Sequence, residues 1–247
     1  MKLPQIIAHQ GGAAEWPPNS RIAFESVALL PVDAVELDVH RTQDGELFVL
    51  HDAALKLPTG RRAVRTLTSS EVREASLNTG GAMTLREVLN LFANVTFDVQ
   101  IDVKTDCYGI DYDGLDDDVA RIVAQSGIGT RIIISSFLPQ TLRRFRDLMP
   151  DVRLRAGLMP LVTEQLGGAF SAIEQYAKLG VTLIDGNFRM LDTRVIEAAK
   201  AYGMTVGVGT VNGRSELIYW LQQPIDRLLT DEPSTALAFR SALHEGQ

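Results

Sequence analysis

Cysteine, aromatic residues and long apolar runs are all scarce in this chain of 247 residues. Its one cysteine, Cys107, excludes an intrachain disulfide and a cysteine-based zinc site, because each needs more than one thiol. No run of about 18 apolar residues suggests a membrane span, and the N-terminal stretch MKLPQIIAHQ lacks the apolar core and cleavage site of a signal peptide. These absences predict a soluble, cytoplasmic protein without stable membrane insertion.

Basic residues are also fewer than acidic ones: the chain has 24 Lys and Arg and 31 Asp and Glu, which gives a net charge of −7. This charge argues against a nucleic acid as the main partner, and a small anionic substrate would need a local positive site. Hydrophobic residues make up 45% and charged residues 22%, as in an ordinary globular protein. With no linker-like Pro/Gly/Ser tract, we expect a single domain over residues 1–247 and leave a homo-oligomer open.

Short β-branched segments alternate with amphipathic segments whose apolar residues recur at helical spacing. The candidate strands are 5–9, 34–39, 95–104, 131–137, 153–159, 181–188, 205–211 and 227–231. Eight strands alternating with helices over this length are typical of an α/β (β/α)₈ barrel, a TIM barrel. A doubly wound open sheet is the alternative, but HQGGAAEW after the first strand does not match the phosphate loop of such folds.

An insertion follows the second strand, over residues 46–82, where ELFVLHD predicts an extra strand and LTSSEVREASL a short helix. Elsewhere, glycines and capping residues predict helix boundaries. The predicted ends are Gly127, Gly180 and Gly203, and the predicted starts are Asp192 and Ser215. The acid-rich stretch 111–118, DYDGLDDD, is best explained as the N-terminus of a helix, with a role in substrate access as the alternative.

Carboxylates occur on strands that should be buried. Glu36 and Asp38 are spaced by two in AVELDV, so they share one face of the second strand, and Asp102 lies near the end of the third. Like charges on neighbouring strands repel, and a hard cation with oxygen ligands would relieve this. We therefore expect one divalent cation, Mg²⁺ or Ca²⁺, with Mn²⁺ also open. In the alternative, the acids form a structural ion-pair layer with neighbouring basic residues: Arg41, Lys104 or Arg131.

Two histidines lie close to these acids in the predicted fold. His9 ends the first strand, and His51 follows the extra strand of the insertion. An unperturbed pKa of about 6.5 suits histidine to both proton donation and proton removal near neutral pH. Beside a cation, His9 and His51 therefore form a candidate general acid and base pair.

These motifs, taken in order, resemble the glycerophosphodiester phosphodiesterase family. The family pattern is H-R-G, P-E-N-T, E-L-D-V, T-x-D-G and H-D, and this chain has HQGG, PPNS, ELDV, TQDG and HD. The match continues through MTLREVL, IDVK, IISSF, GTVN and LLTDEP, and so covers nearly the whole chain. The resemblance implies a TIM barrel that hydrolyses small phosphodiesters to an alcohol and a phosphomonoester with one divalent cation.

The resemblance also implies roles for individual residues. The implied cation ligands are Glu36, Asp38 and Asp102, the implied acid and base are His9 and His51, and the implied substrate-binding residues are Gln10, Lys104, Ser136 and Gly209. The nucleophile would be water or a neighbouring hydroxyl of the substrate, the second passing through a cyclic phosphate.

The chain departs from the family pattern at Gln10, Pro18, Asp102 and Gly209, which replace arginine, glutamate, glutamate and tryptophan. Glutamine offers only neutral donors where arginine grips phosphate with charge, and glycine removes a ring from the expected pocket wall. We expect a shift towards a bulkier, sugar-bearing phosphodiester such as an agrocinopine, with neutral drift as the alternative. Two rivals stay open: a lyase resembling sphingomyelinase D, which would form a cyclic phosphate, and a catalytically weakened phosphodiester-binding protein.

Overall fold

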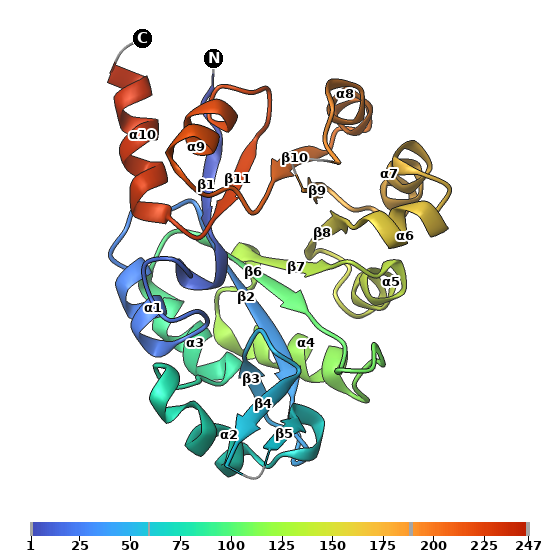
Figure 1. Ribbon diagram of the computed structural model, residues 1–247. Helices are drawn as coiled ribbons and strands as arrows, with labels where there is room; N and C mark the ends of the chain where they lie inside the picture. The colour runs from blue at the N-terminus through green and yellow to red at the C-terminus, as the bar shows by residue number, and fades with distance from the viewer. Residues whose placement is uncertain (1, 59, 188–189, 246–247) are drawn as a thin grey trace.

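The computed structural model describes residues 2–58, 60–187 and 190–245, and a closed barrel of parallel strands forms its centre (Figure 1). The barrel strands are β1 (Gln5–Ala8), β2 (Ala34–Arg41), β6 (Asp98–Val103), β7 (Ile132–Ser136), β8 (Arg153–Leu158), β9 (Leu183–Gly186), β10 (Thr205–Val208) and β11 (Arg227–Thr230). β1 pairs with both β2 and β11, which closes the ring. The predicted TIM barrel is confirmed; residue 188, the end of one predicted strand, lies outside the described residues.

Helices surround the barrel and cover its outer face (Figure 1). They are α1 (Arg21–Val27), α3 (Leu85–Leu91), α4 (Leu115–Ser126), α5 (Pro139–Leu148), α6 (Pro160–Gln165), α7 (Ala169–Lys178), α8 (Thr193–Ala201), α9 (Arg214–Trp220) and α10 (Pro233–Glu245). Each helix turns its buried apolar side chains towards the strands; in α4 these are Leu115, Val119, Ile122 and Val123, at helical spacing. No described helix is long and apolar enough to cross a membrane.

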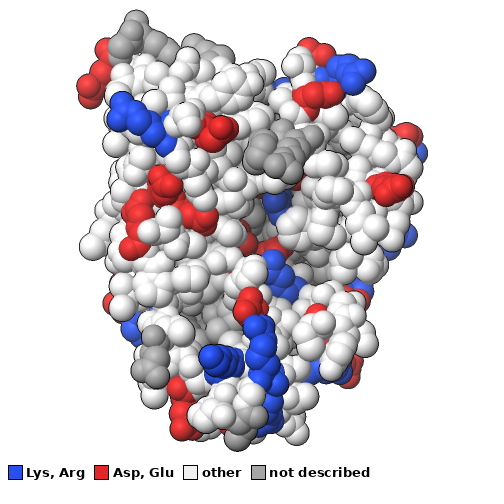
Figure 2. Space-filling view, in the orientation of Figure 1, with Lys and Arg blue, Asp and Glu red and all other residues white. Residues whose placement is uncertain are grey.

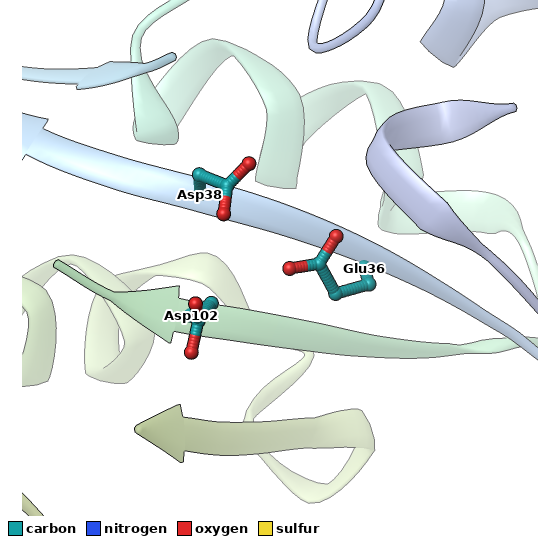
Figure 3. A group of neighbouring side chains, drawn as sticks. All are labelled: Glu36, Asp38 and Asp102. Carbon is teal, nitrogen blue, oxygen red and sulfur yellow. The ribbon is translucent and has the colours of Figure 1, made fainter. Parts of the chain in front are cut away.

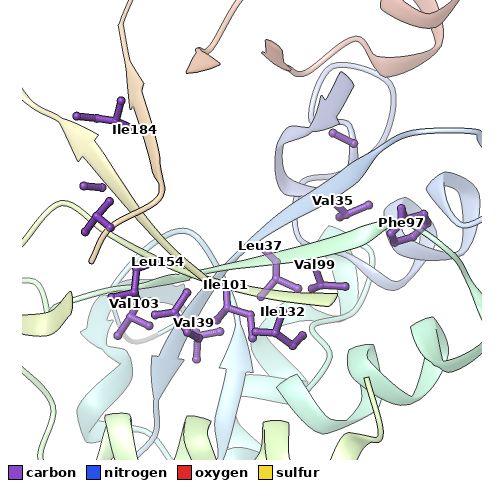
Figure 4. Close-up of a cluster of buried hydrophobic side chains, with 14 of the residues drawn as sticks. Val35, Leu37, Val39, Phe97, Val99, Ile101, Val103, Ile132, Leu154 and Ile184 are labelled. Atoms are coloured by element: carbon purple, nitrogen blue, oxygen red, sulfur yellow. The ribbon is translucent and has the colours of Figure 1, made fainter. Parts of the chain in front are cut away.

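The pleat of the strands separates the core from the site. On β2, Val35, Leu37 and Val39 are fully buried and pack with apolar residues of β6 and the helices (Figure 4). Because successive side chains of a strand point to opposite faces, Glu36 and Asp38 must point the other way, into the barrel. The alternation that stabilises the outer core thus places carboxylates inside.

The insertion after β2 has the predicted extra strand, β3 (Leu47–Val49), antiparallel to β2. It also has the predicted helix, α2 (Ser69–Ser76), which begins with a capping box of Thr68 and Glu71. Between them lies a hairpin that the sequence did not predict, formed by β4 (Ala54–Leu57) and β5 (Gly60–Ala63). β5 carries two arginines and no apolar alternation, so its sequence has no strand pattern.

Most predicted helix boundaries are confirmed. Gly127, Gly180 and Gly203 have φ of +74°, +76° and +73°, the left-handed conformation that ends helices. The Asp192 side chain accepts a hydrogen bond from Val195 N at the start of α8. The prediction for Ser215 is wrong, because α9 begins one residue earlier, after Gly213.

The acid-rich stretch reaches the N-terminus of α4 as predicted, with Asp116, Asp117 and Asp118 in the first turn. None of them caps the helix through its side chain, since Gly114 holds the N-cap position. Asp118 instead binds Arg41 and Asp116 binds Arg144. The predicted location is therefore right, and arginines share the stabilising role with the helix dipole.

Candidate active site

Three buried carboxylates meet inside the barrel on two neighbouring strands (Figure 3). Glu36 and Asp38 come from β2 and Asp102 from β6, where Asp38 and Asp102 are register partners. Each residue is at most 4% exposed, and oxygens of the three lie within 4.8 Å of one another. The structure thus brings together the three acids that the sequence singled out.

Each acid is held by a fixed hydrogen-bond donor. Asn19 Nδ2 donates to Asp38 Oδ2 at 2.7 Å, and the backbone N–H of Gln10 donates to Glu36 Oε2 at 3.1 Å. Asn19 and Gln10 both have positive φ, 52° and 51°, so the loops that carry them are shaped around these contacts. The third donor, Ser135 Oγ of β7, lies 2.9 Å from Asp102 Oδ1.

Lys104 shares the site. Its Nζ lies 2.8 Å from Asp38 Oδ1 and 2.5 Å from Asp102 Oδ2. Burial alone lowers the pKa of Lys104, but the charges of Asp102 and Asp38 outweigh it and raise that pKa above its usual range. The ion-pair alternative therefore holds for Lys104 only: Arg41 binds Asp118, and Arg131 donates to backbone carbonyls of Phe92 and Phe97.

The remaining acid, Glu36, has no ion pair with a lysine or arginine among the described residues. Burial, and then the charge of Asp38, raise its pKa to about 8. Asp38 Oδ1 is buried and accepts no well-aligned hydrogen bond from any described residue, although Lys104 Nζ is near. A set of three carboxylates with an unsatisfied oxygen and a destabilised charge fits a hard divalent cation, which binds oxygen ligands.

His9 lies beside Glu36, in a short 3₁₀ turn directly after β1. Its Nδ1 lies 2.6 Å from Asp231 Oδ1, and its Nε2 lies 3.9 Å from Glu36 Oε2. Burial alone lowers the pKa of His9, but the Asp231 hydrogen bond and the nearby carboxylates raise it to about 9. Asp231 thus fixes one ring nitrogen and leaves Nε2 facing the acids.

His51 is placed differently, at the rim. Its side chain is 59% exposed and its Nδ1 lies 3.0 Å from Asp52 Oδ1. The chain here is fixed to β2, because Leu50 N donates to Asp38 O at 3.0 Å and His40 Nε2 lies 3.1 Å from His51 O. The structure anchors the backbone of His51 next to Asp38 without bringing its ring into the cavity described next.

A cavity of about 370 Å³ opens above the acids. Figure 2 shows a hollow in this face with acidic and basic atoms inside it. The lining includes polar and apolar residues: His9, Glu36, Gln100, Asp102, Lys104, Phe137, Arg155, Leu158, Met159, Pro160, Asp185, Gly186, Asn187, Gly209, Thr210 and Leu229. Its size suits a small polar molecule.

The predicted substrate-binding residues separate into two groups. Lys104 and Gly209 line the cavity, whereas Gln10 and Ser136 do not. Ser136 Oγ instead accepts a hydrogen bond from Leu138 N at 3.2 Å, and Ser135 is the serine that reaches Asp102. The assignment to Ser136 therefore needs correction, because the pleat turns only one of two adjacent serines inward.

Other site residues were missed from the sequence. Asn19 and Asp231 lie within the quoted motifs PPNS and LLTDEP, and their positions there were the available signal. Arg155 and Asp185 also line the cavity, and no motif pointed to them.

Comparisons with known proteins agree with this geometry. The model of the glycerophosphoryl diester phosphodiesterase family matches residues 9–235. A glycerophosphodiester phosphodiesterase from Bacillus altitudinis is 28% identical over 98% of this chain and 100% of its own length. One from Caldanaerobacter subterraneus is 26% identical over 94% of this chain and 96% of its own.

Solved structures share the fold. A candidate glycerophosphoryl diester phosphodiesterase from Agrobacterium tumefaciens superposes with a TM-score of 0.90 at 23% identity, covering 100% of both chains. An Oleispira antarctica phosphodiesterase in complex with the product sn-glycerol-3-phosphate has a TM-score of 0.76 at 18% identity, covering 97% of each. At these identities the likeness shows the barrel alone. The family match over most of the sequence and the acidic barrel mouth lead to one conclusion: this chain belongs to the glycerophosphoryl diester phosphodiesterase family and is a phosphoric diester hydrolase.

Proposed function

We propose that this chain hydrolyses a glycerophosphodiester, or a related sugar phosphodiester, to an alcohol and a phosphomonoester with one divalent cation. The carrying observation is the cluster of three buried carboxylates with Lys104 at its side, opening into a cavity lined by His9. The names of the Bacillus and Caldanaerobacter relatives and the product held by the Oleispira enzyme support this substrate class.

Glu36, Asp38 and Asp102 would hold the cation, Mg²⁺ or Ca²⁺. When bound, it would supply a positive charge that offsets the negative charge building on the phosphate oxygens in the transition state. Asn19, Gln10 and Ser135 keep the three carboxylates in place through the hydrogen bonds described above. Such supporting hydrogen bonds to metal ligands orient them and add to metal affinity.

Side chains of the protein would bind the phosphate and transfer the protons. Lys104 would place its positive charge near the phosphate. To do so, its Nζ would loosen its contacts with Asp38 and Asp102. His9, whose Nδ1 is bound by Asp231, favours the protonated ring and is suited to donate its Nε2 proton to the leaving alkoxide. His51 would remove the proton of the nucleophile from the rim of the cavity.

Which alcohol the substrate carries is the finer proposal, and a bulky one such as the sugar of an agrocinopine is our candidate. Gly209 lines the cavity. However, a Cβ at Gly209 would lie 2.6 Å from Leu229 Cβ, so Leu229 already fills the space beside it. The tryptophan of a Gly209→Trp variant would clash with Leu229. Leu229→Ala, which enlarges the cavity at the same wall, is therefore the better probe of alcohol size.

The test is turnover followed by phosphorus NMR, with Mg²⁺, Ca²⁺, Mn²⁺ or a chelator. The panel comprises glycerophosphocholine, glycerophosphoinositol, a lysophospholipid and a sugar phosphodiester. We expect metal-dependent release of a phosphomonoester, lost in His9→Ala and His51→Ala. A cyclic phosphate product would favour attack by a substrate hydroxyl, and phosphodiester binding without turnover would contradict the proposal in favour of a binding protein.

A further inference from the structure

A buried group of three charged side chains lies beside the cavity, and two of them line it. Arg155 of β8, Asp185 of β9 and Arg227 of β11 are 6%, 4% and 2% exposed. Arg155 Nε donates to Asp185 Oδ2 at 2.9 Å, and Arg227 Nη1 lies 3.7 Å from the same oxygen. Barrel interiors are usually filled by branched apolar residues, and buried ion pairs add little stability over such residues. Stability is therefore a poor explanation for this group.

The group carries an excess of positive charge, since two guanidinium ions share one carboxylate. Arg227 donates to Gln100 Oε1 at 2.9 Å and is not itself among the lining residues. Arg155 is a lining residue. Burial alone lowers the pKa of Arg155, but Asp185 and Asp102 raise it, so this guanidinium stays charged. The excess charge therefore faces the cavity through Arg155.

Arg155 also keeps a donor for a ligand. Nε is used by Asp185, and Nη1 donates to Ser135 Oγ at 3.0 Å. Nη2 has no hydrogen-bond partner among the residues that the structure describes, and it is not among their fully buried unsatisfied atoms. The guanidinium is fixed from two sides, with one N–H edge left over and little entropy to lose on binding.

The Phe137 ring contacts both basic side chains of the cavity wall. Among the described lining residues, Lys and Arg occur at Lys104 and Arg155, and both lie over the Phe137 ring, with Nζ 5.7 Å and Cζ 5.4 Å from its centroid. Lys104 contacts two carboxylates, those of Asp38 and Asp102. Arg155 contacts one, that of Asp185, and shares it with Arg227. Of the two, Arg155 is the less neutralised.

We propose that Arg155 is a substrate-binding residue, which donates from the β8 wall to a non-bridging oxygen of the phosphate. This inference rests on the proposed function, because it places a phosphate between the acid cluster and Arg155. Ser135 joins the two sides, as it accepts from Arg155 and donates to Asp102. A planar guanidinium anchored in this way is suited to phosphate, which it binds through charged hydrogen bonds.

Calorimetric titration of the Mg²⁺-loaded full chain with sn-glycerol 3-phosphate tests the inference. Arg155→Gln should weaken binding by roughly tenfold or more, the usual effect of losing a hydrogen bond to a charged group. Arg155→Lys keeps the positive charge but lacks the planar guanidinium, so it should lose less affinity. The matched control is Arg153→Gln, two residues earlier on β8, where the arginine binds Asp98 away from the cavity and is 38% exposed; it should stay within about twofold of wild type.

Three further readouts decide the outcome. The Mg²⁺ titration of the ligand-free protein and its thermal unfolding show whether Arg155→Gln keeps the cation site and the fold, and Arg155→Lys serves if it does not. KM should rise more than kcat falls, because the contact exists in the ground state. Equal phosphate affinity in wild type and Arg155→Gln would overturn this inference and leave the proposed function standing. Wild type that binds no phosphate and turns over no phosphodiester would overturn both.

Discussion

Replacing Asp231 by asparagine should lower the pKa of His9. The Asp231 carboxylate lies 2.6 Å from His9 Nδ1 and, in the metal-free protein, helps to hold the pKa of that ring at about 9. Asparagine is nearly isosteric but neutral, so the charge is lost while the burial of His9, which lowers its pKa, remains. We expect the His9 pKa to fall by about 1 to 2 units.

The shift has a consequence for stability. Because the folded pKa of His9 is raised above its unfolded value of 6.5, the contribution to stability is complete below that pH and is lost as the pH rises to about 9. A shift of this size corresponds to roughly 3 kcal/mol, of which Asp231 supplies a part. Chelated wild type should therefore lose more unfolding free energy over this window than Asp231→Asn does.

The assay is a proton–carbon NMR titration of the four histidine rings in chelated protein, with His9→Gln to assign the signal. Asp226→Asn is the matched control, because Asp226 directly precedes β11 and pairs with Lys200 far from His9. Urea unfolding at both ends of the pH window gives the stability difference. An unchanged His9 pKa in Asp231→Asn, or an equal fall in Asp226→Asn, would refute the reasoning.

Three further changes have defined expectations. Asn19→Ala removes the donor to Asp38 Oδ2 and should weaken Mg²⁺ binding by about tenfold in a calorimetric titration; unchanged affinity would mean that Asn19 only shapes its loop. Thr68→Ala breaks the capping box of α2 and should cost about 1 kcal/mol in urea unfolding while turnover stays constant. Gly207→Ala would place a Cβ 2.1 Å from Asp185 Oδ1, so it should cost roughly 1 to 3 kcal/mol and disturb the Arg155 group; full stability with normal phosphate affinity would speak against that crowding.

The barrel and the acid cluster could be predicted because they follow from periodicity. Alternation along β2 separates Val35 and Leu37 from Glu36 and Asp38, and this alone predicts carboxylates on one face of a buried strand. The position of His9 at the end of the first strand placed it near the same acids, and the family resemblance gave Lys104 a substrate-binding role. The structure confirms that these residues converge, which spacing along one strand could not show.

The site residues that could not be predicted depend on how the loops fold and on the closing of the barrel. Asn19 and Asp231 lie in loops, and their contacts with Asp38 and His9 exist only once the backbone has turned. Arg155 in RLRAGLM looks like the polar face of a half-exposed strand, and only the closed barrel shows that this face is the interior. For Ser135 and Ser136 the sequence does not indicate which side chain points inward, since a shift of one residue exchanges the faces.

Phosphodiester turnover in Asp38→Asn, set against wild type across a Mg²⁺ titration, tests most directly whether the acid cluster is the catalytic cation site. Phosphorus NMR of glycerophosphocholine and a sugar phosphodiester would follow the product. We expect wild type to release a phosphomonoester only with added cation, to stop with chelator and recover when Mg²⁺ is restored, and we expect Asp38→Asn to be nearly inactive at every Mg²⁺ concentration. Turnover that survives both the chelator and the substitution would contradict a cation held by Glu36, Asp38 and Asp102.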